Sequence, residues 1–306
     1  MAQFAPADTA RAERKALPMH QSTRHPARKI FAVATVAVVA AIAVIPVSAA
    51  SAATHRNHPA PNSKNLTIVL EHGAWSDGSS WSGEVTRLEA DGYKVLVPPN
   101  PLRGLASDSA YLANFVKNHT TGPVLLVGHS YGGAVITDAG LSDPEIKGLV
   151  YVDAFAPAQG QTLGGILAAS TSALNATTAN PIASIFAIVP FDDPTSTDAD
   201  VYLQPATVKN VFAQDLSPAQ QALIAAEQRP IAFSTFSEQA SAPAYASLPS
   251  WYVVGTQDHA IPEATQVAMA TAAHSKITYV NSSHVSLISH PGLVTSVIEK
   301  AAESVG

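Results

Sequence analysis

Short apolar runs alternate with amphipathic stretches along most of the chain. The apolar runs, each rich in Val, Ile, Leu or Tyr, lie at residues 66–70, 93–97, 124–127, 148–152, 251–254 and 277–280. Amphipathic stretches typical of helices lie between several of them, at residues 81–91, 105–118 and 134–141. Strands of a parallel sheet are continuously apolar because helices cover both of its faces. The pattern therefore predicts an α/β fold with a mostly parallel central sheet flanked by helices.

This alternation stops between about residues 156 and 245. Ala, Ser, Thr and Pro dominate there, with helical pieces such as residues 217–227. We expect the segment to be a mainly helical cap that is inserted over the sheet, within one domain of residues 65–306. Residues 54–64 are rich in Pro, Asn and His without apolar periodicity, and we expect them to form a linker.

The first 53 residues have the order of a secretory signal. Six Lys or Arg residues precede an uncharged run from Ile30 to Ile45, and small residues then offer cleavage sites after Ala49 or Ala52. The run is shorter than the roughly 20 apolar residues of a membrane-spanning helix. We therefore expect residues 1–53 to be cleaved on export to the periplasm or the exterior. A retained membrane anchor is the alternative.

Charge and composition exclude several kinds of partner. Without the leader, the chain loses six of its 17 Lys and Arg and two of its 23 Asp and Glu, which leaves a net charge of −10. Such a domain repels nucleic acid and anionic lipid, so we expect no nucleic-acid partner and no stable membrane partner after cleavage. With no Cys and no evident His, Asp and Glu cluster, we expect no metal. Small neutral or apolar substrates fit this composition better.

A candidate nucleophile lies in the segment Gly128-His129-Ser130-Tyr131-Gly132, which has the form G-x-S-x-G. An apolar strand precedes this segment and a helical run follows it. A sharp strand-to-helix turn would hold Ser130 in a strained conformation, and the two glycines would let neighbouring backbone approach it. The N-terminus of the helix would favour negative charge at the same point. We expect Ser130 to be a catalytic nucleophile.

A serine hydroxyl is a weak nucleophile at neutral pH and needs a histidine as general base. Of the four histidines that follow the cap, only His284 lies in a short polar loop directly after a strand. His259, His274 and His290 lack that placement, and we expect them to be structural or exposed to solvent. His284 is therefore the predicted base.

The base in turn needs a carboxylate that orients its ring, and in this motif's usual order the acid lies between the serine and the histidine. Asp258 follows the strand at residues 251–254 and precedes His284 by 26 residues, which is enough for one helix and one strand. Asp153 also ends a strand and would lie at the same edge of the sheet. We favour Asp258 and keep Asp153 as the alternative.

Acyl transfer also needs N–H donors that stabilise the oxyanion, and an apolar pocket for the substrate. The residue after the nucleophile, Tyr131, supplies one predicted donor. Ala74, in the loop after the first strand, supplies the second, and Gly73 before it allows a tight turn. Trp75 and Phe155 are candidates to line the pocket, although aromatic residues at such positions are as often ordinary core.

Several segments resemble α/β hydrolases, namely bacterial carboxylesterases, plant methylesterases and hydroxynitrile lyases. They are Ile68–Trp75, Gly128–Gly133, Gly255–Pro262 and Ser283–Pro291. The resemblance implies a cofactor-free esterase with a mostly helical cap. It also implies that Ser130, Asp258, His284 and Ala74 are nucleophile, acid, base and first oxyanion donor.

One position separates the chain from part of that family. The lyases carry a lysine directly after the catalytic histidine, where this chain has Val285, so we do not expect lyase activity. The leading hypothesis is a serine hydrolase that cleaves carboxylic esters through an acyl-enzyme. The alternatives are lactone or amide hydrolysis by the same residues, or a non-catalytic binding protein of the same fold.

Overall fold

The computed structural model describes residues 64–193 and 195–306. The predicted leader, residues 1–53, and nearly all of the predicted linker lie outside these residues, so both stay predictions. Across residues 64–193 and 195–306, none of the helices combines the length and the apolar character that crossing a membrane requires.

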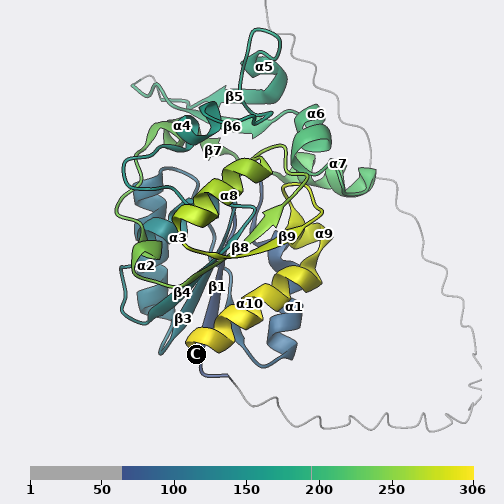
Figure 1. The fold of residues 1–306 in the computed structure, drawn as a ribbon. Coiled ribbons are helices and arrows are strands. Elements are labelled where there is room, and N and C mark those ends of the chain that lie inside the picture. Colours follow the sequence, from purple (N-terminus) through teal and green to yellow (C-terminus); the bar gives the residue numbers. More distant parts are fainter. Residues whose placement is uncertain (1–63, 194) are drawn as a thin grey trace, which may run out of the picture. The chain divides into compact units, whose positions relative to one another are not determined.

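A six-stranded parallel sheet forms the centre of the molecule (Figure 1). Its strands lie in the order β2-β1-β3-β4-β8-β9. Their bounds are β1 Thr67–Glu71, β2 Lys94–Leu96, β3 Val124–His129, β4 Ile146–Val152, β8 Ser250–Gly255 and β9 Lys276–Val280. All residues of β1, β3 and β8 are buried. Each of the six apolar runs is a strand, and the predicted fold class is confirmed.

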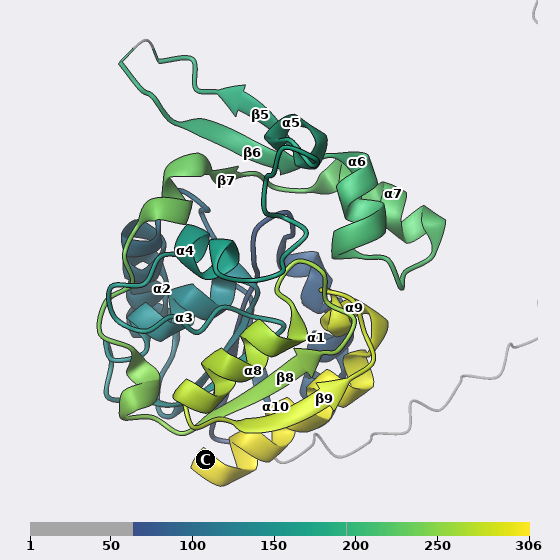
Figure 2. The same cartoon turned by 45° about the horizontal axis from the view of Figure 1, so that its top comes forward.

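Helices cover both faces of the sheet, because each crossover between parallel strands places its helix on one face. Helices α1 and α10 pack together on one face, and α2, α3 and α8 cover the other (Figures 1 and 2). Their bounds are α1 Ser82–Ala90, α2 Leu105–His119, α3 Tyr131–Ala139, α8 Glu263–Ala272, α9 Ser286–Ser289 and α10 Pro291–Val305. The short α9 leads into α10.

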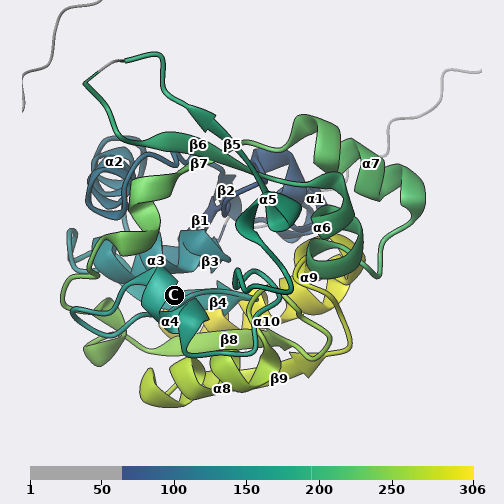
Figure 3. The same cartoon turned by 90° about the horizontal axis from the view of Figure 1, so that it is seen from above.

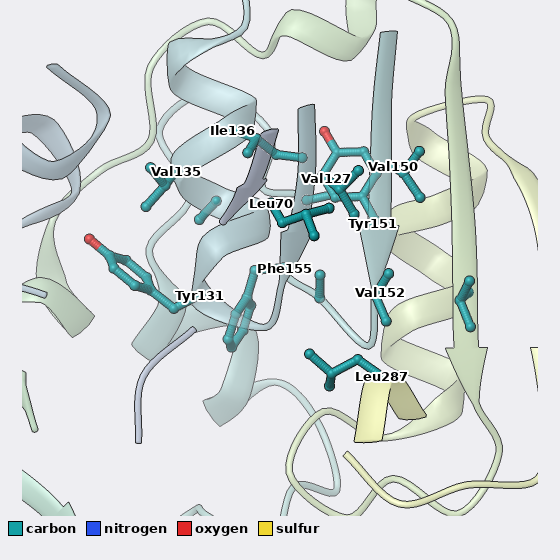
Figure 4. Close-up of a cluster of buried hydrophobic side chains, with 14 of the residues drawn as sticks. Leu70, Val127, Tyr131, Val135, Ile136, Val150, Tyr151, Val152, Phe155 and Leu287 are labelled. Atoms are coloured by element: carbon teal, nitrogen blue, oxygen red, sulfur yellow. The ribbon is translucent and has the colours of Figure 1, made fainter. Parts of the chain in front are cut away.

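The core lies between the sheet and these helices. Figure 4 shows Ile136 of α3 pointing toward the strands that carry Val127 and Tyr151, and all three side chains are fully buried. Burying an aliphatic side chain of this size contributes about 1.5–3 kcal/mol. Because these residues lie next to the carboxyl ends of β3 and β4, the packing that stabilises the fold also holds the backbone on which the site is built.

Most of residues 156–245 lie above the carboxyl ends of the strands (Figures 1 and 3), and the last part runs back along α3, where Ser241 bonds to Asp138 and the turn Ala244–Ala246 contacts that helix. Their helices are α4 Leu163–Ala168, α5 Ile182–Ile185, α6 Pro205–Thr207, a π-helical turn Val208–Phe212, α7 Pro218–Glu227 and the 3₁₀ turns Phe233–Ser237 and Ala244–Ala246. A three-stranded antiparallel sheet accompanies them, made of β5 Phe186–Pro190, β6 Ala199–Leu203 and β7 Ile231–Ala232. The sequence pattern indicated the helical pieces but not this sheet, whose strands are short and partly exposed.

Candidate active site

Ser130 occupies the sharp turn between β3 and α3. Its backbone has φ +53, a left-handed conformation that is costly for a residue with a Cβ. The neighbouring glycines make this turn possible. A Cβ on Gly128 would lie 2.5 Å from the carbonyl oxygen of Gly132, and one on Gly132 would lie 2.5 Å from that of Glu71. The strained turn directs the Ser130 hydroxyl away from the strand.

His284 lies in the loop between β9 and α9, and its ring joins the other two predicted residues. Its Nε2 lies 2.7 Å from Ser130 Oγ, and its Nδ1 lies 2.7 Å from Asp258 Oδ2. Because a carboxylate can only accept, Nδ1 carries the proton and Nε2 is free to accept the proton of the serine. All three residues are at least 96% buried. The arrangement suits proton transfer from Ser130 to His284.

Asp258 is held by its own set of donors in the loop after β8. Its Oδ1 accepts hydrogen bonds from the backbone N–H of Ala260, at 2.8 Å, and of Ile261, at 2.9 Å. Its Oδ2 accepts a third from Gln266 Nε2, at 2.8 Å, in addition to the His284 ring. Three donors besides the imidazole therefore hold this carboxylate in the orientation that faces the ring.

The alternative acid, Asp153, lies nearby but makes a different bond. It directly follows β4 in a left-handed conformation, φ +46, and its Oδ2 accepts a hydrogen bond from the backbone N–H of Ser286, at 2.9 Å. Burial, together with the charge of Asp258, raises the pKa of Asp153 to about 7. Of the two carboxyl groups weighed from the sequence, the structure brings Asp258 to the imidazole.

The surroundings of His284 tune the base. Burial lowers the pKa of its ring, but the charge of Asp258 and the hydrogen bond to it raise that pKa, and the net result lies above the ordinary value of 6.5. His129 contacts the backbone of the base, because its Nε2 lies 2.8 Å from the carbonyl oxygen of His284. Burial holds the pKa of His129 well below its usual range, so this ring is neutral.

The two predicted oxyanion donors lie beside the nucleophile. Ala74, Tyr131, Ser130 and His284 all line one cavity. Neither the N–H of Ala74 nor that of Tyr131 donates a hydrogen bond to another of the residues that the structure describes. Gly73 allows the loop that carries Ala74 to approach Ser130, since a Cβ at position 73 would lie 2.6 Å from the Cβ of Ser130. Both amides are therefore available to an oxygen bound in the cavity.

Both predicted pocket residues line the same cavity. Trp75 and Phe155 are about 95% buried there. The phenol of Tyr131 points away from the nucleophile and donates to Asp108, at 2.7 Å. We name this space the catalytic cavity; its volume is only about 20 Å³. That is close to the space of a single water molecule.

Two cap residues near the base were not predicted from the sequence. The ring of Phe212 lies 5.1 Å from the ring of His284. The carboxylate of Asp215 accepts hydrogen bonds from the backbone N–H of Ser283, at 3.1 Å, and from the hydroxyl of Ser282, at 3.0 Å. A lone Asp or Phe in a segment without periodicity carries no motif that would single it out.

The remaining histidines after the cap do not reach the site. His259 contacts the carbonyl of Asn210 through Nδ1, at 3.3 Å, and His290 bonds to the neighbouring Ser289, at 2.9 Å. His274 lies two residues after the end of α8 and is exposed. Among the described side chains, no three His, Cys, Asp or Glu residues come together as ligands for a metal ion.

Comparisons with known proteins identify the family and the fold of the chain. A model described as the alpha/beta hydrolase family matches residues 68–297. A carbendazim-hydrolysing esterase of Nocardioides sp. is 36% identical over 114 residues, which are 33% of this chain and 46% of that esterase. The match therefore spans less than half of that relative.

Solved structures of the same fold include two esterases. Polyneuridine aldehyde esterase superimposes with a TM-score of 0.66 at 19% identity and covers 78% of this chain and 100% of its own. The methylesterase MES16 from Arabidopsis gives a TM-score of 0.62 at 17% identity, with 78% and 100% covered. The resemblance to plant methylesterases inferred from the sequence is confirmed at the level of family and fold.

Proposed function

Because the chain belongs to the alpha/beta hydrolase family, we propose that it hydrolyses carboxylic esters of small neutral or apolar molecules through Ser130, His284 and Asp258. One observation carries this proposal: two hydrogen bonds of 2.7 Å connect the carboxylate, the imidazole and the hydroxyl in an unbroken, buried chain. The similarity to a carbendazim-hydrolysing esterase supports ester chemistry over other reactions of the fold.

The first half of the reaction forms an acyl-enzyme. Ser130 Oγ attacks the carbonyl carbon of the ester while His284 Nε2 takes the hydroxyl proton. The carbonyl oxygen becomes negative and accepts hydrogen bonds from the N–H groups of Ala74 and Tyr131. The C–O bond to the alcohol then breaks, and the imidazolium gives its proton to the leaving alcohol.

The second half returns the enzyme to its starting state. His284 takes a proton from a water molecule, whose oxygen attacks the acyl carbon on Ser130. The tetrahedral intermediate collapses, the bond to Ser130 Oγ breaks, and the imidazolium returns the proton to the serine. Asp258 keeps its charge throughout, and it holds Nδ1 as the protonated nitrogen so that Nε2 faces the reacting groups.

We further propose that the leader within residues 1–53 directs export and is removed by cleavage after Ala49 or Ala52, as the order of basic, apolar and small residues indicates. N-terminal sequencing of the protein recovered outside the cytoplasm would test this. A first residue at Ala50 or Ala53 is the expected result, and an intact Met1 in the membrane fraction would contradict it.

A fluorophosphonate probe tests the proposed nucleophile directly. We expect the wild type to be labelled on Ser130, located by mass spectrometry of peptides, and to release p-nitrophenol from p-nitrophenyl acetate. Ser130→Ala should abolish both, and the exposed Ser142→Ala should change neither. A folded wild type that neither labels nor cleaves would refute the function, and labelling at another serine would refute the assignment.

A further inference from the structure

The catalytic cavity is too small for the reaction proposed for it. Its volume of about 20 Å³ holds roughly one water molecule, whereas even an acetate ester has several heavy atoms. A larger space lies next to it, with a volume of about 270 Å³, and we name it the outer groove. It lies between α7, α9 and the start of α1, which Figure 3 shows on the same side of the molecule.

Trp75 separates these two spaces. It is the one residue, among those the structure describes, that lines both. Phe212 extends the partition, since its ring lies 6.1 Å from that of Trp75 and 5.1 Å from that of His284, and it faces the outer groove. The partition therefore consists of two aromatic side chains beside the catalytic base.

The cap holds Trp75 in place at two points. The indole Nε1 donates to the carbonyl of Val201 in β6, and the backbone N–H donates to the carbonyl of Arg229 after α7, both at 2.9 Å. Its backbone has φ +58, a conformation that costs on the order of 1 kcal/mol or more for a residue other than glycine. Strain of this kind persists only where surrounding contacts enforce it, so movement of the cap would release the side chain.

The chemistry of the outer groove suits an uncharged apolar group. Its apolar wall includes Leu216, Leu223, Ile224, Leu287 and Ile288. Serines, two glutamines and two acidic residues, Asp77 and Glu227, form its polar part, and no Lys or Arg of the described chain lines it. A carboxylate or phosphate would meet negative charge without a partner, whereas a hydrocarbon chain would be removed from water.

From these observations we infer that the outer groove is a second substrate subsite, which takes the neutral hydrocarbon chain of an ester when the Trp75 side chain turns away and joins it to the catalytic cavity. The inference rests on the proposed ester hydrolysis at Ser130. Trp75 is then a specificity-determining residue, and its position sets the length of chain that the enzyme accepts.

Two substrate series test the subsite and distinguish the two sides of the ester. The acyl series is p-nitrophenyl acetate, butyrate and octanoate, and the alcohol series is ethyl, butyl and octyl acetate. The measurement is the ratio of kcat/KM for the longest member to that for the shortest. Ile224→Trp fills the groove and should lower this ratio about tenfold in at least one series. Trp75→Ala removes the side chain that lines both spaces and should raise this ratio by a similar factor.

A bulk-matched variant on the same helix provides the control. Ala222→Trp places an equal side chain on an exposed position of α7 that does not line the groove, and the ratio should stay at the wild-type value. Labelling of Ser130 by the small fluorophosphonate shows that each variant retains its site. Trp75→Phe replaces Trp75→Ala if the latter does not fold, with the same direction expected.

The outcomes separate the subsite from the reaction. A response in the acyl series assigns the groove to the acyl chain, and a response in the alcohol series assigns it to the alcohol. Active, labelled variants whose ratios match the wild type in both series would overturn the subsite and leave the esterase intact. A wild type that cleaves neither series and does not label would remove the esterase and the subsite together.

Discussion

The carboxyl edge of the central sheet and the cap above it line the same catalytic cavity but are built from different kinds of sequence. On the sheet side, all six residues of β3 are buried and the helices on both faces hold them. On the cap side, strand β5 is half exposed, with Ile188 41% and Val189 52% accessible. The nucleophile therefore lies on the most constrained part of the chain, and the cover lies on a much less constrained part.

The difference indicates a division of roles. The strained turn at Ser130 and the donors around Asp258 are contacts within the core, so the reacting atoms need little from the cap for their geometry. The cap closes the cavity and is tied to the core by hydrogen bonds between single residues, among them Val201 with Trp75 and Asp215 with Ser283. We expect changes in the core to abolish turnover and changes in the cap to modify it.

Asp258 and Asp153, the two buried carboxyl groups whose charges act on His284, give the largest expected effect. Asp258→Asn should lower kcat for p-nitrophenyl acetate by about 10,000-fold, because an amide cannot hold the imidazole in the required tautomer. Asp153→Asn should lower it less than about tenfold, since the amide oxygen still accepts the hydrogen bond of Ser286 and no bond to the imidazole is lost. Equal losses in the two variants would overturn the assignment of the acid.

A cap residue tests whether the division is strict. Asp215 accepts hydrogen bonds from the loop that carries His284, so Asp215→Ala should loosen the base and lower kcat by about tenfold with little change in KM. Asp215→Asn, which keeps one acceptor, should recover part of the loss. Steady-state kinetics on a short ester measures both constants.

The matched control for this prediction is Asp193→Ala. Asp193 is an exposed carboxylate of the cap whose side-chain hydrogen bonds to other described residues are to Thr195 alone, so its loss should change neither constant. If Asp215→Ala instead raised KM at constant kcat, Asp215 would act in substrate binding rather than in positioning the base. An unchanged kcat and KM would restrict the cap to controlling access.

The same contrast explains what could be predicted from the sequence. The strands of the central sheet are visible because burial on both faces requires continuous apolar runs, as at residues 124–127. The nucleophile is visible because Gly128 and Gly132 lie where a Cβ would collide with backbone. These requirements act on neighbouring residues, so they leave a local pattern.

The cap left little of this pattern. Strand β7 consists of Ile231 and Ala232 alone. Strand β5, Phe186–Pro190, is an apolar run, but it is partly exposed and pairs antiparallel with β6, so it does not continue the alternation of strands and helices that marks the central sheet. Asp215 acts on Ser283, 68 residues away, through a single side chain. The sequence suggested Trp75 as a pocket residue, but its place between two spaces depends on contacts with β6 and with the segment after α7. Such long-range contacts between irregular segments have no periodic signature.

The smallest expected effect concerns pH and comes from the second carboxyl group. Hydrolysis needs a neutral His284, so kcat/KM should rise with pH through the pKa of this ring, above 6.5. Burial lowers that pKa, and the charges of Asp258 and Asp153 raise it. Asp153→Asn removes one of these charges, so the acidic limb of the pH profile, where kcat/KM rises with pH, should move to lower pH. We expect a shift of less than about one unit, because Asp153 is itself partly protonated near pH 7.

Profiles of kcat/KM between pH 5 and pH 9 would measure this shift, with Asp193→Asn as the control that should leave the limb in place. The direction of the shift separates two roles for Asp153. A limb that moves to lower pH means that its carboxylate acts on the base through its charge. An unmoved limb would mean that Asp153 is protonated throughout this range and only holds the backbone of Ser286. Of the two carboxyl groups, Asp258 alone would then raise the pKa of His284 through its charge.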